Sequence, residues 1–526
     1  MKPFLARTAT FLKNNKNTDW LFLAIGLAVF GVLSLWHISA ASIWFDEAFS
    51  AYIVQFSFVD IARYTAADVH PPMYYWLLKV WELFFGTSEL ALRSMSTFFG
   101  GVSIIFGFLL VRRLFGRKAA LYSLLFLIVS PMLIRYSQEA RMYTLAAAVV
   151  MAASLVLTYA VEAKKKALWV LYGVLIALGM WIHYFTALAW LAHWVWRGLV
   201  IFKKRMKFSE FRRKFFTTNW LLAHIIAVSL FLPWLPFMAI QLGGIQGTGF
   251  WIGAIGIYTP ANYLTNFFYY LEQSRTLGWA AFALIVAVVT MTVLTVRVFK
   301  KLSKQQRLNY LFIIALAIVP VVLLFLVSLP PLKSSFVERY LIPAVVGLSL
   351  YIGVTIAYAS KWTHTFVIAG VTVLMVGMML FGITNVYKYG NFNKNSETHI
   401  LTKQLIQEIT EKAEPGQPIV SNSPWVFYEA VFYSTDEHPV YFIDENTSYE
   451  FGSLDMLKYE PRNKITDLAA FEEDNPVIWY IGTTSDDDVA PYNPSWQKLQ
   501  TAAPYDSLTG KTIYRGTQYN VSSSAE

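Results

Sequence analysis

Cysteine is absent from this chain of 526 residues, and charged residues make up only 14% of it. Without cysteine the chain forms no disulfide bond, so any part of it outside the cytoplasm must fold on its hydrophobic core alone. The hydrophobic fraction is 56% and the aromatic fraction 17%, with a mean hydropathy of +0.46. These values exclude an ordinary soluble domain and indicate a protein that crosses a membrane many times.

Long apolar runs recur from residue 20 to about residue 386 and then stop. A membrane-spanning helix needs about 20 predominantly apolar residues. The predicted fold class of residues 1–386 is therefore a polytopic α-helical membrane protein with about eleven transmembrane helices. The eleven predicted spans are residues 20–40, 90–111, 119–136, 143–161, 167–182, 185–202, 217–240, 277–297, 309–329, 340–360 and 363–386.

The charges divide the chain where the apolar runs end. Residues 1–386 carry 33 Lys and Arg against 12 Asp and Glu, whereas residues 387–526 carry 10 against 21. The basic residues lie in short clusters between apolar runs, which is the positive-inside pattern and not a nucleic-acid-binding surface. The clusters are residues 112–118, 164–166, 203–214 and 297–307, and Lys361. With eleven spans, this pattern predicts a multi-pass plasma-membrane protein whose N-terminus is cytoplasmic and whose tail is extracytoplasmic.

Residues 41–89 form a large first loop on the outer face in this topology. The aromatic and apolar segment 73–85 of this loop is too short for a span, and it predicts an interfacial helix that lies on the membrane surface. The alternative is that this segment forms a short second span. That alternative would invert every later loop and place the basic clusters outside, so we reject it.

Residues 387–526 have a different character, with short strand-like and helix-like segments in alternation. Strands are predicted at residues 418–421, 439–443, 477–481 and 512–514, and a helix at residues 425–433. Such alternation is typical of a small α/β domain. We therefore predict two domains, a transmembrane domain at residues 1–386 and an extracytoplasmic α/β domain at residues 387–526.

The unusual polar residues of the membrane part gather at the outer face. Ionisable residues at membrane depth are costly and usually face a cavity, so they mark functional sites. The residues are Asp46 and Glu47 at the start of the first loop, His70 before a pair of prolines, Glu139 and Arg141 at the end of the third span, His183 and Tyr184 between the fifth and sixth spans, and Arg339 and Tyr340 at the start of the tenth.

Each of these positions also has a structural interpretation. Glu139 and Arg141 would form an ion pair at a helix end, His183 would be an interface histidine, and Arg339 would be anchored among lipid headgroups. The carboxylates Asp46 and Glu47 would lie in a solvated loop. Five such positions on one face nevertheless favour a cavity.

The residue types at this face narrow the chemistry. The sequence has no His-x-x-His or His-Glu-x-x-His spacing typical of a zinc site, no glycine loop in a phosphate-binding context and no nucleophile-elbow serine. A carboxylate base, several cations and many aromatic residues remain. They suit a lipid-linked substrate that enters from the membrane, with Arg or Lys on its phosphate and a carboxylate that takes a proton from an acceptor hydroxyl.

Six motifs in this order resemble those of the GT-C superfamily of glycosyltransferases, in the branch of the protein O-mannosyltransferases and the lipid A aminoarabinose transferase. The motifs are Trp44-Phe45-Asp46-Glu47, His70-Pro71-Pro72-Met73-Tyr74-Tyr75, Glu89-Leu90-Ala91-Leu92-Arg93, Tyr136-Ser137-Gln138-Glu139-Ala140-Arg141-Met142-Tyr143, His183-Tyr184-Phe185 and Glu338-Arg339-Tyr340-Leu341. The resemblance implies an inverting transfer of mannose or another hexose or pentose from a polyprenyl-phosphate donor. The acceptor would be a hydroxyl group of a protein, lipid or glycan at the outer face.

The resemblance also assigns roles. Asp46 corresponds to the general base of the family's first loop, with the adjacent Glu47 as the alternative. Glu139 corresponds to an acidic position that helps to bind the acceptor or the donor. Arg141 and Arg339 would hold the phosphate of the donor.

Tyr340 would lie beside the donor phosphate. The predicted substrate-binding residues also include His183, Tyr184 and, in the first loop, His70. In the aminoarabinose transferase a lysine precedes the paired prolines, and here His70 takes its place, which points away from that substrate. Metal dependence varies within the superfamily. No residue pattern here commits the chain to a divalent cation.

A membrane transporter or flippase of lipid-linked or small polar solutes is the alternative function. Such a protein would show inverted repeats and polar or broken spans near the midplane of the membrane. In this sequence the polar residues lie at the outer ends of the predicted spans. A scaffold or lipid sensor, as a third possibility, would tolerate the loss of Asp46, whereas a transferase would not.

Overall fold

The computed structural model describes residues 16–163, 165–202, 206–248, 252–270, 278–390, 400–444, 455–459, 462–484, 486–505 and 514–522. The chain forms two compact units. Unit 1 comprises Met1–Trp36, Arg93–Pro236 and Phe250–Lys388, and unit 2 comprises His37–Leu92, Phe237–Gly249 and Tyr389–Glu526. The predicted first loop therefore belongs to the same unit as the predicted tail domain.

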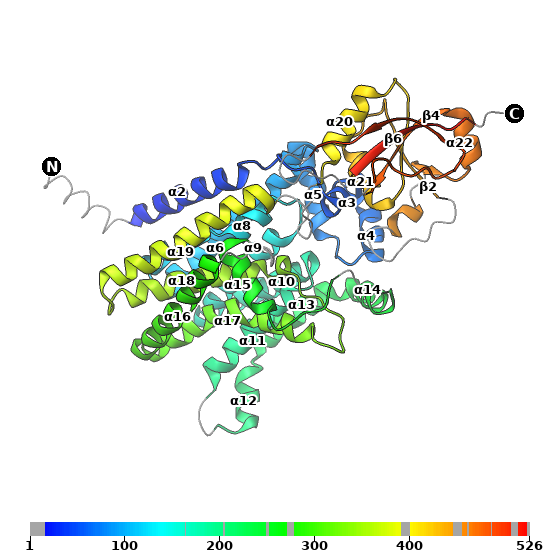
Figure 1. Ribbon diagram of the computed structural model, residues 1–526. Coiled ribbons are helices and arrows are strands. Elements are labelled where there is room, and N and C mark those ends of the chain that lie inside the picture. The colour runs from blue at the N-terminus through cyan, green and yellow to red at the C-terminus, as the bar shows by residue number, and fades with distance from the viewer. Residues whose placement is uncertain are drawn as a thin grey trace. The chain divides into compact units, whose positions relative to one another are not determined.

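Unit 1 is built from helices, most of which lie side by side in a bundle (Figure 1). Two of the helices, α6 and α14, continue into unit 2. The helices are α2 (Lys16–Leu35), α6 (Glu89–Phe115), α7 (Arg117–Ile128), α8 (Pro131–Ser137), α9 (Tyr143–Ala163), α10 (Lys166–Ile182), α11 (Thr186–Ile201), α12 (Phe208–Phe215), α13 (Thr218–Phe231), α14 (Leu235–Thr248), α15 (Thr259–Tyr269), α16 (Gly278–Lys301), α17 (Lys304–Val327), α18 (Ile342–Ala359) and α19 (Thr365–Asn385).

The helices confirm a polytopic membrane protein, but they do not confirm eleven spans. In the described residues, eight helices are long and apolar enough to cross a membrane, and α7 with α8 makes a ninth if this bent pair is one span. Helices α10 and α11, where the fifth and sixth spans were predicted, have 17 and 16 residues. They are shorter than the roughly 20 residues that a straight span requires.

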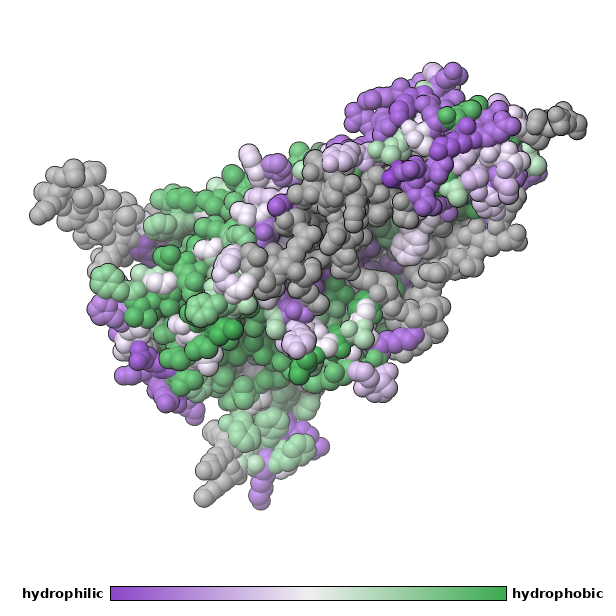
Figure 2. Space-filling model, in the orientation of Figure 1, coloured by the Kyte–Doolittle hydropathy of each residue, from purple (hydrophilic) through white to green (hydrophobic). Residues whose placement is uncertain are grey.

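The surface of the bundle agrees with a lipid environment. Along α16, exposed apolar side chains recur every three or four residues, at Phe282, Ile285, Val289, Val293 and Val296. This spacing places them on one face of the helix. Figure 2 shows hydrophobic residues over much of the visible face of the bundle. Helix α18, in contrast, is buried at every position except Tyr351.

A bend between α7 and α8 changes the direction of the chain just before Arg135 and Tyr136. The two helices meet at an angle of 58°, and α8 begins with Pro131 after the extended residue Ser130. Proline has no backbone N–H and disfavours a helical conformation in the residue before it, so the helix breaks at this point. The short helix α8 then carries Arg135 and Tyr136 away from the axis of α7.

Unit 2 combines helices with a sheet. Its first part contains α3 (Phe45–Ile53), α4 (Phe58–Ala67) and α5 (Met73–Phe85). The bounds of α5 are those of the predicted interfacial helix. Helices α3 and α4 were not predicted individually, because each has only 9 or 10 residues and lies in a segment that the sequence marks only as a loop.

The tail adds further helices and a six-stranded sheet in the order β3-β2-β1-β4-β6-β5. Neighbouring strands from β3 to β4 are parallel, whereas β6 is antiparallel to β4 and β5. The elements are α20 (Thr402–Lys412), β1 (Ile419–Ser421), α21 (Pro424–Tyr433), β2 (Val440–Ile443), β3 (Lys464–Ile465), α22 (Leu468–Asp474), β4 (Val477–Thr483), β5 (Gln497–Ala502) and β6 (Tyr514–Asn520).

The predicted α/β character of the tail is confirmed. Four predicted elements lie where they were expected: strands β1, β2 and β4 and helix α21. The fourth predicted strand was 512–514, and residues 512 and 513 lie outside the described part. Strands β3 and β5 were missed. Strand β3 has only two residues, and β5 is mostly polar and exposed, so neither carries an apolar signal.

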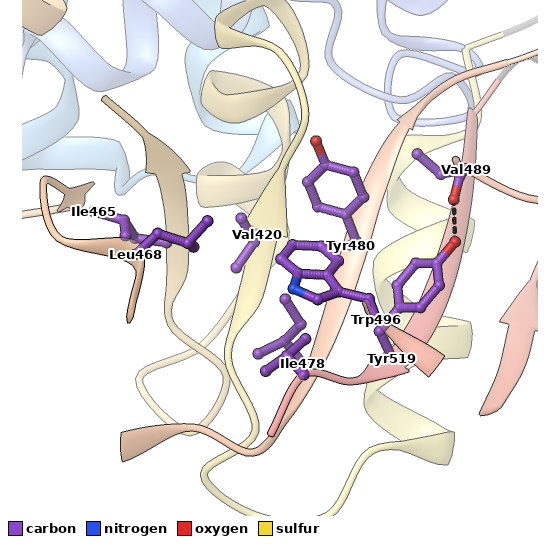
Figure 3. Packing of buried hydrophobic residues seen from close by; sticks show 9 residues of the cluster. Val420, Ile465, Leu468, Ile478, Tyr480, Val489, Trp496 and Tyr519 are labelled. Carbon is purple, nitrogen blue, oxygen red and sulfur yellow. Dashed lines mark hydrogen bonds between the residues drawn. The ribbon is translucent and has the colours of Figure 1, made fainter. Parts of the chain in front are cut away.

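A cluster of aromatic and aliphatic side chains forms the core on one face of this sheet (Figure 3). Trp496 lies against Tyr480 at 5.3 Å and Tyr519 at 5.6 Å between ring centroids. The Tyr519 hydroxyl donates a hydrogen bond to the carbonyl oxygen of Val489. The sheet thus has a hydrophobic core of its own and needs no disulfide bond.

Candidate functional site

The first acidic pair lies on a helix of unit 2 and not in an irregular loop. Asp46 and Glu47 occupy the first turn of α3, which follows the extended residue Trp44. Consecutive helical residues point about 100° apart, so the two carboxylates face different surroundings. Glu47 is only 1% exposed, whereas Asp46 is partly exposed. Of the two, Asp46 is the carboxylate that a substrate reaches more easily.

Helix α3 packs against α21 of the tail through aromatic rings. Phe45 lies 4.4 Å from Trp425 and 5.7 Å from Tyr428 between ring centroids. Further along α3, Phe49 and Tyr52 contact the same Tyr428 at 5.9 and 5.1 Å. The tail therefore forms one wall around the helix that carries the acidic pair.

His70 is held by an acidic residue that precedes it by two positions. The Nδ1 atom of His70 lies 3.2 Å from Oδ2 of Asp68, and both side chains are largely buried. Asp68 ends α4, and Pro72 precedes the first residue of α5. A carboxylate at Nδ1 fixes the orientation of an imidazole ring and favours a proton on that nitrogen. The sequence shows Asp68 two positions before His70 but does not show this contact.

Glu89 connects the first loop with the tail inside unit 2. Its carboxylate accepts a hydrogen bond from Lys403 Nζ at 2.9 Å and another from the Tyr433 hydroxyl. The same hydroxyl accepts the backbone N–H of Ile43 at 2.6 Å. Glu89 belongs to a sequence motif to which no role could be assigned, and its partners follow it by more than 300 residues.

In unit 1, Glu139 forms a buried ion pair at the end of α8. Its Oε2 atom lies 2.8 Å from Nη2 of Arg135, one helical turn earlier, and the two side chains are 0% and 3% exposed. The guanidinium of Arg135 also lies 5.6 Å from the centre of the Tyr136 ring. An ion pair of Glu139 was predicted with Arg141, but Arg135 was not predicted as a site residue.

Arg141 is buried just beyond this pair. Its backbone N–H donates to the carbonyl oxygen of Glu139 at 2.7 Å, and its own carbonyl oxygen accepts the hydroxyl of Ser96 at 3.1 Å. These contacts fix a tight turn between α8 and α9. Arg141 thus lies in the turn between the two helices, two residues before α9 begins at Tyr143.

Four aromatic residues from three motifs meet in unit 1. Tyr340 stacks on Phe185 at 4.8 Å and lies 4.9 Å from the His183 ring. Tyr143 lies 5.9 Å from His183 and 6.2 Å from Tyr340. The guanidinium of Arg339 lies 5.8 Å from the centre of the Tyr143 ring, within the range of a cation–π interaction.

Tyr184 lies beside this group and is anchored from another helix segment. Its hydroxyl accepts a hydrogen bond from Nε1 of Trp234 at 2.7 Å. Glu338, next to Arg339, accepts one from Nδ2 of Asn266 at 3.0 Å. These bonds hold the turn that contains His183 and the short 3-10 helix Glu338–Leu341 that contains Arg339.

The predicted site residues therefore fall into two groups. Those of unit 2 are Asp46, Glu47 and His70, and those of unit 1 are Glu139, Arg141, His183, Tyr184, Arg339 and Tyr340. A chain of contacts in unit 1 runs from Glu139 through Arg135, Tyr136 and Tyr143 to Arg339 and His183.

The charges of the unit 1 group favour an anionic ligand. Arg135, Arg141 and Arg339 are each buried, with 3%, 3% and 5% exposed, and guanidinium groups bind phosphate oxygens through directed hydrogen bonds. Buried cations interact with an anion more strongly than exposed ones because the surroundings screen them less. In the part of the chain that the structure describes, no three His, Asp or Glu side chains are grouped so that they could hold a metal ion.

Comparison with known proteins connects this geometry with a family. Residues 69–237 match the model of the dolichyl-phosphate-mannose-protein mannosyltransferase family. This segment includes the motifs around His70, Glu139 and His183. No curated protein sequence matches the chain.

Two crystal structures of ArnT from Cupriavidus metallidurans have a similar fold. The apo structure is 15% identical with a TM-score of 0.59, and the match covers 89% of this chain and 93% of that one. The structure bound to undecaprenyl phosphate is 14% identical with a TM-score of 0.60, and the match covers 96% and 99% of the two chains. The likeness extends over both units and, at this identity, concerns the fold.

Proposed function

We propose that this protein is a membrane glycosyltransferase of the GT-C superfamily, which transfers a sugar from a polyprenyl-phosphate donor to a hydroxyl group of a protein, lipid or glycan. The family match over residues 69–237 and the fold shared with ArnT support the proposal. The observation that carries the proposal is the buried group in unit 1, where Tyr143, His183 and Tyr340 from three sequence motifs meet beside the guanidinium of Arg339. Two further buried arginines, Arg135 and Arg141, lie close in the chain to Tyr143. The transfer takes place at the outer face of the plasma membrane. The N-terminus is cytoplasmic in this proposal, and the sheet domain is extracytoplasmic.

The carboxylate of Asp46 acts as the general base. It takes the proton of the acceptor hydroxyl, whose oxygen then attacks the anomeric carbon of the donor sugar from the face opposite the phosphate. The bond between this carbon and the phosphate oxygen breaks, and the phosphate leaves with the electron pair, so the configuration inverts. The partial exposure of Asp46, compared with the buried Glu47, supports this assignment.

The guanidinium groups of Arg141 and Arg339 hold the donor phosphate. As the sugar leaves, negative charge grows on the phosphate oxygens, and cations in a dry site stabilise this charge without reorganising. Three further residues of unit 1 would orient the donor: Tyr340, His183 and Tyr184. Glu139, whose charge is balanced by Arg135, would help to bind the donor or the acceptor.

His70 contributes to the choice of substrate. Its ring is oriented by Asp68, so it offers a directed hydrogen bond where the aminoarabinose transferase has a lysine ammonium. An imidazole ring presents a different arrangement of hydrogen-bonding groups from an ammonium group. We therefore expect a donor or an acceptor different from those of that enzyme.

Mass spectrometry of glycolipids and glycoproteins tests the function directly. Cells that lack the protein should lose one class of glycosylated product and accumulate the polyprenyl-phosphate sugar that is its donor. Re-expression of the wild-type chain should restore the product. Identical glycolipids and glycoproteins with and without the protein would contradict the proposal.

Replacement of Arg339 with alanine should weaken the binding of undecaprenyl phosphate to the purified protein about 10- to 100-fold, because a buried charge-assisted contact to phosphate is lost. Arg339→Lys should keep part of the affinity, since it keeps the charge but not the planar fork. Binding can be followed by intrinsic tryptophan fluorescence. Arg297→Ala provides the control, because Arg297 is exposed and bonds to Thr363. Equal affinities of the two alanine variants would argue that Arg339 is only an anchor.

A further inference from the structure

Helix α3, which carries Asp46, begins without a cap of its own. The residue before it is Trp44, whose side chain makes no capping hydrogen bond. The first N–H groups of any helix lack partners within that helix and need them from elsewhere. In α3 the second and third helical residues are the acidic pair itself, and the N–H of the first, Phe45, has a partner in another segment.

That partner is Glu429 of α21. The backbone N–H of Phe45 hydrogen-bonds the Glu429 carboxyl group, which is 1% exposed. The same carboxyl group accepts the hydroxyl of Thr402 at 2.5 Å and lies 3.5 Å from the hydroxyl of Tyr514. Three segments of the tail therefore hold one carboxyl group against the start of α3.

The surroundings of this carboxyl group also raise its pKa. Burial and the nearby negative charge of Glu47 raise the pKa of Glu429, the hydrogen bonds from Thr402, Tyr514 and Phe45 lower it, and the resulting pKa is about 8. A carboxyl group with this pKa is mostly protonated at neutral pH. It therefore accepts the N–H of Phe45 without adding a full third negative charge beside Asp46 and Glu47.

A second contact on the same face of α21 holds the chain at Ile43, two residues before Phe45. Tyr433 lies four residues after Glu429, on the same side of the helix. Its hydroxyl accepts the backbone N–H of Ile43 and donates to Glu89. Trp425, four residues before Glu429, packs on the ring of Phe45. One face of α21 thus contacts the chain at both Ile43 and Phe45, directly before Asp46.

We propose that Glu429 is a positioning residue of the transferase: it caps α3 from the tail and so holds the Asp46 carboxylate in its place for proton transfer. The proposal rests on the function proposed above for Asp46. It assigns the tail a part in catalysis, because the cap of the helix that carries the base is supplied from about 380 residues further along the chain.

Hydrogen exchange on the full-length protein in detergent measures the cap itself. In Glu429→Leu, the amides of residues 45–48 should exchange about tenfold faster than in the wild type, the effect of losing a helix cap. Glu429→Gln keeps an acceptor oxygen and no charge, so it should exchange like the wild type. Glu411→Leu, an exposed position on α20, is the matched control and should also show no change. Unchanged exchange in Glu429→Leu would overturn the proposal.

Protection of β4 reports whether the variant is folded. If Glu429→Leu also loses protection in residues 477–483, the domain has unfolded, and Glu429→Asp then decides. This milder variant withdraws the carboxyl group by one methylene. Faster exchange confined to the first turn of α3 would support the cap, and wild-type exchange there would overturn it.

Sugar transfer distinguishes positioning from a merely structural role. Glu429→Leu should lower kcat at least about tenfold with little change in the KM for the donor, and Glu429→Gln should restore it. Equal transfer by Glu429→Leu and the wild type would overturn the positioning role. If instead Asp46→Asn still transfers sugar while Glu429→Leu exchanges faster, the cap stands and the role proposed for Asp46 fails.

Discussion

Replacement of Asp46 with asparagine is expected to lower the rate of sugar transfer about 10²- to 10⁴-fold, the range found when a general base is removed. Asparagine keeps the size and hydrogen-bonding capacity of the side chain but cannot take up the proton of the acceptor hydroxyl. Because Asp46 is partly exposed in the first turn of α3, the variant should fold and insert normally. Transfer is measured as the product identified by mass spectrometry, and folding as a single peak in gel filtration.

Two variants make this result specific. Asp60→Asn carries the same substitution in the first turn of the next helix, α4, and should transfer sugar at nearly the wild-type rate. Glu47→Gln should have a smaller effect than Asp46→Asn, since Glu47 is buried. Loss of transfer in Glu47→Gln together with normal transfer in Asp46→Asn would move the base to Glu47. Normal transfer in both variants would exclude a carboxylate base at this position.

Replacement of Glu139 with glutamine is expected to lower the free energy of unfolding by about 3–5 kcal/mol. The substitution leaves the buried guanidinium of Arg135 without the carboxylate that it faces at 2.8 Å. A buried charge that loses its partner keeps the cost of its removal from water. The change is measured as a lower midpoint of thermal unfolding of the purified protein in detergent.

An exposed ion pair supplies the matched control for this prediction. Glu162 pairs with Arg113 and is 77% exposed, so Glu162→Gln should cost less than about 1 kcal/mol. The double variant Arg135→Met with Glu139→Gln should recover much of the loss, because no unbalanced charge stays in the interior. Equal shifts in Glu139→Gln and Glu162→Gln would show that the Arg135–Glu139 pair is not held in a dry environment.

Much of the architecture follows from local patterns. A helix lies at each of the eleven apolar runs, and α5 has the predicted bounds, because the length and periodicity of an apolar segment are properties of that segment. The number of spans is different. It depends on how α10 and α11, with 17 and 16 residues, and the bent pair of α7 and α8 are arranged in the membrane. No local pattern determines this arrangement.

The resemblance to GT-C glycosyltransferases, based on six short motifs, agrees with the family model that matches residues 69–237 and with the fold. Short motifs of this kind are informative because they contain charged side chains, such as Asp46 and Arg339, where charged residues are otherwise rare. The motifs do not reveal the partners of these groups. Asp68 at His70 and Arg135 at Glu139 became apparent only in the structure.

The sequence by itself determined that this protein crosses a membrane many times, that its tail is an α/β domain and that a small set of its motifs resembles those of one superfamily. Only the tertiary structure decided which segments meet: that Glu139 pairs with Arg135, and that Glu429 and Tyr433 of α21 hold the start of α3. The reason is physical. Apolar content and side-chain chemistry act locally, whereas the partner of a buried polar group is set by the packing of segments that lie hundreds of residues apart.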